Sequence, residues 1–374
     1  METAIPTTLW RKIGCATSLA GVVVAAELLD RTRFPAPHMI LAIVVGAVLA
    51  LTARPPAPLP RTVSIGAQAL LGVLMGSYLE LSLLSSIGLA MMPVLVITAA
   101  TLLVSVLVAI VFARFAAVEL STATLGLLAG GSAAVVACAD ELDADPRRVA
   151  FMQYLRVAFV ALSAPALAAL LDSDDRLAAG AAAQAGAITN PDLPQWMIVG
   201  RGDQVAGLSI AIVLCLIGIR LGRYLRLPSP MLIGPMLATA ALTAIGISHG
   251  YAPTNLLKAL LFAVIGFEIG TRFTRQVVTE MAKMIPGLTA AIFALCAVVA
   301  GLAFGLAACT DLELLDLYLA TTPGGINAIL ATAEGMDANM PLITSVQSIR
   351  LLLMVLTLPL VLHLLRRHHP PTTP

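Results

Sequence analysis

The chain has 374 residues, of which 59% are hydrophobic and only 11% are charged. Because soluble domains carry about 25% charged residues, this composition excludes an ordinary soluble protein and predicts an integral membrane protein. The formal net charge of +1 offers no basis for binding nucleic acid. The five cysteines and five histidines stand without the spacing of a metal site, so we expect no metal and no cofactor.

Apolar segments follow one another along the chain, six in each half. A membrane-spanning helix needs about 20 apolar residues. Segments of roughly this kind cover 13–29, 38–53, 62–79, 88–113, 119–139 and 149–171, and then 206–221, 230–247, 255–271, 285–309, 313–333 and 342–365. We therefore predict a first membrane repeat at 1–171, a linker at 172–205 and a second membrane repeat at 206–374.

The two halves share residues at a fixed offset of 194 positions. The matching residues are Gly130-Gly131 with Gly324-Gly325, Gln153 with Gln347, Arg156 with Arg350, Gly72 with Gly266, and Gly76 with Gly270. Duplicated halves with interrupted apolar segments at matching positions are a common construction of secondary transporters.

The fifth segment of each half contains the glycine pair, and two adjacent glycines interrupt a helix. In the second copy Pro323 precedes the pair and strengthens the interruption. Backbone groups freed in this way must be buried in protein or line a cavity. The segment is therefore either a broken spanning helix or a re-entrant hairpin.

The distribution of Lys and Arg favours the hairpin. If both fifth segments re-enter, the second half is inverted, and with a cytoplasmic N-terminus fifteen of the 22 Lys and Arg residues lie inside. The five that lie outside are Arg31, Arg33, Arg176, Arg201 and Lys258. We predict an all-α polytopic membrane protein formed by an inverted internal duplication, with about ten transmembrane helices and two re-entrant Gly-Gly hairpins.

Each glycine pair is a candidate anion site, because a half-helix that starts at membrane depth presents free N–H groups and the positive end of its dipole. The alternative is that the glycines only permit tight helix packing. The candidate substrate-binding residues are Gly130, Gly131 and Ser132 in the first copy, and Thr322, Gly324, Gly325 and Asn327 in the second.

Two polar pairs lie inside the sixth segments, Gln153 with Arg156 and Gln347 with Arg350. The i, i+3 spacing places both members on one helix face. Each Arg is roughly 10–12 Å into a bilayer core of about 30 Å, where it must face a polar partner or a cavity. All four are candidate substrate-binding residues, and the alternative role is hydrogen bonding to carbonyls freed in the hairpin.

Acidic residues close both hairpins. Asp140 and Glu334 match at the same offset, and each is a candidate for pairing with the following Arg or for binding a coupling Na⁺ or H⁺; the alternative is a solvated helix end. Glu268 lies inside an apolar segment, and we expect it to pair with Arg272 at i+4. The repeated Gly-x-x-x-Gly patterns predict close helix contacts.

The doubled pattern of Gly-Gly, an acid, Gln-x-x-Arg and a later Pro resembles the AbrB membrane-protein duplication family. The second copy, from Thr322 to Arg350, is the closer match, whereas Ala129 stands where the pattern has proline in the first. Members are labelled ammonia monooxygenases or AbrB-type regulators. The resemblance implies a layout similar to inverted-repeat citrate and glutamate symporters and cation antiporters. A monooxygenase needs a metal or flavin site, which no cluster of residues indicates, so we do not expect an enzyme.

These observations predict an ion-coupled secondary transporter of a small anionic organic solute in a bacterial inner membrane. The alternative is a membrane-bound sensor that affects gene expression without transport. The partners expected are the lipid bilayer and a small solute, with a homodimer left open and no nucleic acid.

Overall fold

A computed structural model describes most of the chain. The described residues are 7–30, 36–52, 59–78, 92–128, 144–171, 203–225, 229–244, 251–310, 312–336 and 338–350, with a few isolated residues between them. Throughout these ranges the regular structure is helical, apart from one isolated bridge between Val199 and Pro253.

The described helices follow the predicted apolar segments closely. In the first half they are α1 (Thr7–Asp30), α2 (Pro37–Leu51), α3 (Arg61–Tyr78), α5 (Met92–Ala116), α6 (Leu120–Leu127) and α8 (Pro146–Leu171). In the second half they are α10 (Gln204–Tyr224), α11 (Pro230–Ala244), α12 (Asn255–Thr271), α13 (Arg275–Met281), α14 (Ile285–Ala307), α15 (Leu314–Thr321) and α16 (Ile326–Gly335). A final helix covers 340–350.

Three of the described helices are long and apolar enough to cross a membrane on their own: residues Val96–Ala116 of α5, together with α10 and α14. Others are apolar but shorter, such as α2 and α11 with 15 residues each. At 1.5 Å per residue such a helix is roughly 22 Å long, less than the ~30 Å hydrocarbon core. The helices therefore identify a membrane protein, and the count of ten spans stays a prediction.

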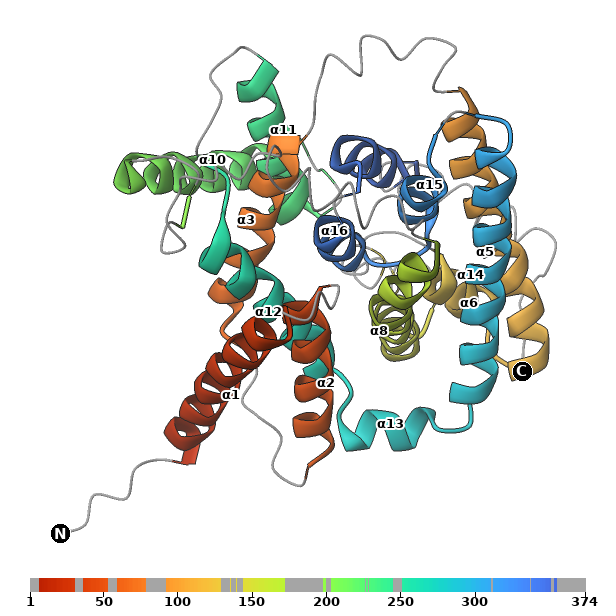
Figure 1. The fold of residues 1–374 in the computed structure, drawn as a ribbon. Coiled ribbons are helices and arrows are strands. Elements are labelled where there is room, and N and C mark those ends of the chain that lie inside the picture. The colour runs from red at the N-terminus through yellow and green to blue at the C-terminus, as the bar shows by residue number, and fades with distance from the viewer. Residues whose placement is uncertain are drawn as a thin grey trace.

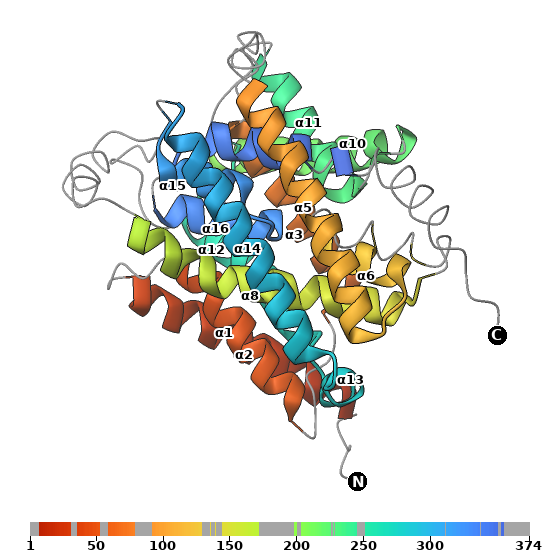
Figure 2. The ribbon, with the colours of Figure 1, turned by 90° about the vertical axis from the view of Figure 1, so that its right-hand side faces the viewer.

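The helices form two groups, and each group takes elements from both halves of the sequence. The first bundle consists of α1, α2, α3, α10, α11 and α12, on the left of Figure 1. The second bundle consists of α5, α6, α8, α14, α15 and α16. Figure 2 shows the second bundle from its outer side, with the long helix α14 crossing in front. Contacts between the bundles run mainly through α8 and α16, which touch α2 and α12.

Glycines hold the first bundle together by close backbone approach. A Cβ atom at Gly72 of α3 would lie 2.3 Å from the carbonyl oxygen of Leu232 in α11. A Cβ at Gly270 of α12 would lie 2.3 Å from the carbonyl oxygen of Ile43 in α2. No side chain fits at these distances, so the close contacts predicted from the Gly-x-x-x-Gly patterns are confirmed.

Helices α3 and α12, the matching third segments of the two halves, run in opposite directions. Ser64, near the start of α3, donates a hydrogen bond of 2.6 Å to Glu268, near the end of α12. Glu268 also accepts a 3.1 Å hydrogen bond from Arg272, which confirms the predicted i, i+4 pair.

Candidate functional site

The fifth segment of the second half is broken where the glycines predict. Helix α15 ends at Thr321, the chain bends at Gly324, whose amide donates to the carbonyl oxygen of Thr322 at 2.9 Å, and α16 begins at Ile326. In the first half α6 ends at Leu127. The candidates Gly130, Gly131 and Ser132 lie outside the described residues.

Arg350 is bound to the carbonyl groups freed at this break. Its Nη1 donates to the carbonyl oxygens of Thr322 at 2.6 Å and Thr321 at 3.3 Å, and its Nη2 donates to Gly324 at 3.3 Å. Nη2 also donates to Oε1 of Gln347 at 2.5 Å. Gln347 in turn donates through Nε2 to the carbonyls of two earlier residues in α15, Leu319 and Ala320, both at 3.0 Å.

Arg156 repeats this arrangement at the end of α6. Its Nη1 donates to the carbonyl oxygens of Leu128 at 2.7 Å and Leu127 at 2.9 Å. Its Nη2 donates to Oε1 of Gln153 at 2.8 Å, and Gln153 donates to the carbonyls of Leu125 and Leu128. A helix C-terminus leaves carbonyls unsatisfied and carries negative partial charge. Both Gln and Arg pairs thus hydrogen-bond to carbonyls at the ends of α6 and α15, which is the alternative role that the sequence left open, and their contact with an anion stays a prediction.

The two guanidinium groups are buried. Arg156 is 0% and Arg350 3% exposed. Among the described residues neither has a carboxylate at ion-pair distance, and Nε of each has no hydrogen-bond partner. A buried charge is costly unless an opposite charge or dipole offsets it.

The break of the second half packs against α8, the helix that carries Arg156. A Cβ at Gly325 would lie 2.9 Å from Val157 of α8, and one at Gly324 would lie 2.6 Å from Val160. The break of the second half therefore packs against α8 about one helical turn from Arg156. The site combines residues that are 194 positions apart in the sequence.

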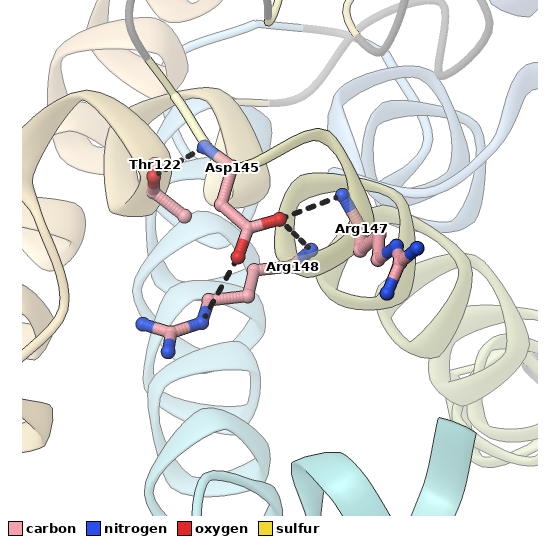
Figure 3. Close-up of polar contacts among 4 residues, drawn as sticks. All are labelled: Thr122, Asp145, Arg147 and Arg148. Carbon is pink, nitrogen blue, oxygen red and sulfur yellow. Dashed lines mark hydrogen bonds and ion pairs between the residues drawn. The ribbon is translucent and has the colours of Figure 1, made fainter. Parts of the chain in front are cut away.

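The first helix of each fifth segment, α6 or α15, contacts the chain that follows the segment. The amide of Asn339, after α16, donates to Oδ1 of Asp316 in the first turn of α15 at 2.9 Å. In the first half the amide of Asp145 donates to Oγ1 of Thr122 in α6 at 3.0 Å. Figure 3 shows this contact and how the Asp145 carboxylate accepts from the amides of Arg147 and Arg148 at the start of α8. Thr122 matches Asp316 and Asp145 matches Asn339 at the offset of 194 positions. Our sequence prediction missed this signal.

Glu334 has different partners from those predicted. Its Oε1 accepts from Nζ of Lys258 in α12 at 2.5 Å and from the hydroxyl of Tyr78 in α3 at 3.1 Å. It does not pair with Arg350, because Arg350 is bound to carbonyls, and it is not a solvated helix end, because its side chain is 18% exposed. The matching Asp140 lies outside the described residues.

The hydroxyl of Thr322 donates to the carbonyl of Tyr318 in its own helix at 2.6 Å. The side chain of Asn327 lies outside the described part of the structure. Within that part, no group of three His, Cys, Asp or Glu residues is placed to hold a metal ion.

Comparison with known proteins identifies relatives of similar length. The sequence profile of the family described as "Transition state regulatory protein AbrB" matches residues 39–366. A protein of Escherichia coli (strain K12) named "Putative regulator AbrB" is 32% identical over 358 residues, which cover 94% of this chain and 97% of the relative. "Uncharacterized protein YhjN" of Bacillus subtilis (strain 168) is 27% identical over 321 residues, covering 83% and 80%.

No solved structure matches the chain. The profile covers most of the sequence and includes both Gly-Gly pairs and both buried arginines. The expected resemblance is confirmed: the chain belongs to the AbrB family.

Proposed function

We propose that this protein is an ion-coupled secondary transporter of a small anionic organic solute, located in a bacterial inner membrane. The observation that carries the proposal is the pair of buried guanidinium groups, Arg156 and Arg350, which lie at the C-terminal ends of α6 and α15 and have no carboxylate partner in the described ranges.

The charge balance of the site favours an anion. Each Arg is bound to a helix C-terminus that carries roughly −0.5 charge, so two of them offset about one of the two positive charges. The start of α16 adds positive potential, because its N-cap Gly325 has no side-chain cap for the free amides. A bound monoanion would complete the balance at this point.

The arrangement of the halves supports alternating access. Helices α3 and α12 are antiparallel, as expected for an inverted duplication. The contacts of Asn339 with Asp316 and of Asp145 with Thr122 favour hairpins that return to the side they left. On this proposal the chain has ten spans and two re-entrant hairpins, and the second bundle carries the solute while moving against the first.

The second candidate is a membrane-bound sensor that binds a ligand and transports nothing. It is favoured by the names of the family and of the Escherichia coli relative, which both refer to regulation.

Flux measurements separate the two candidates. We would reconstitute the protein in liposomes, impose an H⁺ or Na⁺ gradient, and measure uptake from a panel of labelled mono- and dicarboxylates. Uptake that is lost in Arg350→Ala and kept in Glu280→Gln, a substitution on the surface helix α13, is the expected result. Binding of a carboxylate without any uptake would reject transport in favour of the sensor.

A further inference from the structure

The two bundles are joined at one end of α12 by a cluster of three polar side chains. Lys258 of α12 and Tyr78 of α3 belong to the first bundle, and both donate to Oε1 of Glu334 in α16 of the second bundle, at 2.5 and 3.1 Å. The Lys258 side chain is 28% exposed and that of Glu334 18%. A partly buried, charge-assisted contact of this kind contributes more than one at the surface.

The carboxylate of Glu334 is incompletely satisfied. Its second oxygen, Oε2, is buried and has no hydrogen-bond partner in the described part of the chain. Glu334 also lies in the last turn of α16, where the helix dipole disfavours a negative charge. The charged form therefore depends on Lys258, and the free oxygen is available to take a proton.

The surroundings suit a proton better than Na⁺. A sodium ion would need several oxygen ligands, but Glu334 is faced by an ammonium group and a hydroxyl donor. An ammonium nitrogen 2.5 Å from the carboxylate repels any metal cation at that oxygen. A proton on Oε2 instead removes the negative charge that holds Lys258.

We propose that Glu334 is the proton-binding group of this protein, and that its protonation releases α16 from α12 and α3 so that the bundles can move. The inference rests on the proposed function for its role in transport. A solvent proton binds the carboxylate to form the neutral acid, and the ionic contact between the bundles is lost.

The opposite end of α12 provides an internal comparison. There Arg272 and Ser64 donate to Glu268, and all three belong to the first bundle. Ser64 and Arg272 match Lys258 and Tyr78 at the repeat offset of 194, so each end of the helix pair presents one cation and one hydroxyl to one carboxylate. Only at the Glu334 end does that carboxylate come from the other bundle.

Other charged groups on the elements packed against α16 have partners elsewhere. Arg156 of α8 is bound to the carbonyls of α6, and Asp316 of α15 accepts from the amide of Asn339. Tyr154 of α8 lies against Arg272, with the guanidinium carbon 5.1 Å from the ring centroid. Arg350, in the helix after α16, is bound to the carbonyls of Thr321, Thr322 and Gly324.

Hydrogen exchange of the full chain in lipid nanodiscs tests the inference without any solute. Exchange of the amides in α16 and at the start of α12 is measured by mass spectrometry from about pH 8 down to about pH 3, a range that extends below the ordinary pKa of glutamate carboxyls, with correction for intrinsic rates. In the wild type we expect these amides to become roughly 5- to 30-fold less protected on acidification, equivalent to losing a contact between the bundles. Glu334→Gln should show the less protected state at every pH.

Two further variants make the result decisive. Glu268→Gln removes the carboxylate at the other end of α12 and should keep the wild-type pH step in α16. Glu334→Asp retains an ionisable group and should keep a weaker step, which separates loss of the proton site from general loosening. A pH step that persists in Glu334→Gln, or α16 protection in that variant equal to wild type near pH 8, overturns the proposal. Transport can fail in the flux assay while this step is present, so the two proposals are tested separately.

Discussion

At the residue scale, the buried arginines act first on the protein's own backbone. The guanidinium of Arg350 donates hydrogen bonds to three carbonyl oxygens and to the side-chain amide oxygen of Gln347. Only a planar group with several donors can make this set of bonds. Arg156 makes similar bonds to two carbonyls and one side-chain amide, so both residues fix the ends of α6 and α15 in place. Replacement by Lys keeps the positive charge and loses this set of hydrogen bonds.

Arg350→Ala should therefore destabilise the protein. Each buried carbonyl that is left unsatisfied costs about 1–3 kcal/mol, so we expect a loss of roughly 2–4 kcal/mol in unfolding free energy, with Arg350→Lys between Ala and wild type. Denaturant unfolding in detergent measures the change, and Arg275→Ala, an exposed position on α13, is the control. A stability within about 0.5 kcal/mol of wild type would contradict this role.

At the element scale, the helices of the first bundle touch backbone to backbone through their glycines. This is why the third helix of each half packs on the second helix of the other, α3 on α11 and α12 on α2. The prediction of close contact needed only the four-residue spacing of the glycines, whereas the identity of the partner helix depends on contacts far apart in the sequence.

Gly270→Ala should weaken this packing, because the new Cβ would lie 2.3 Å from a carbonyl oxygen of α2. Overpacking of this kind costs about 1–3 kcal/mol. Gly301→Ala in α14 is the matched control, since nothing lies within 4 Å of its Cβ position and the helix should gain about 1 kcal/mol. Thermal unfolding of both variants measures the difference, and equal melting temperatures would refute the contact.

The helices and their contacts also show which features of the structure can be predicted from sequence patterns. The break at Gly324 and the pair of Glu268 with Arg272 were predictable, because both depend on a few neighbouring residues. Short helix α13 was missed, since a seven-residue amphipathic helix leaves little periodicity. The contact of Lys258 with Glu334 was also missed, because it depends on how two bundles pack.

At the scale of the whole molecule, two groups of polar contacts lie at opposite ends of the α3 and α12 pair. Ser64 and Glu268 lie at one end, and Tyr78, Lys258 and Glu334 at the other. The positive-inside rule, which uses only the distribution of Lys and Arg along the sequence, assigns the same two groups to opposite faces of the membrane.

Cysteine labelling tests this orientation. In a background without native cysteines, Arg275→Cys should react with an impermeant maleimide only from the cytoplasmic face, and Asn339→Cys only from the outer face; both positions are exposed. Labelling of both from one face would exclude the inverted arrangement.

The interleaving of the halves has a consequence for biosynthesis. Because α2 packs on α12 and α3 on α11, the first bundle cannot close until the ribosome has made almost three quarters of the chain. Until then the glycine-containing faces of α2 and α3 lie in the bilayer without α12 and α11, the helices on which they pack. Premature termination before the end of α12 would therefore yield a fragment whose first bundle is unassembled, a substrate for membrane quality-control proteases.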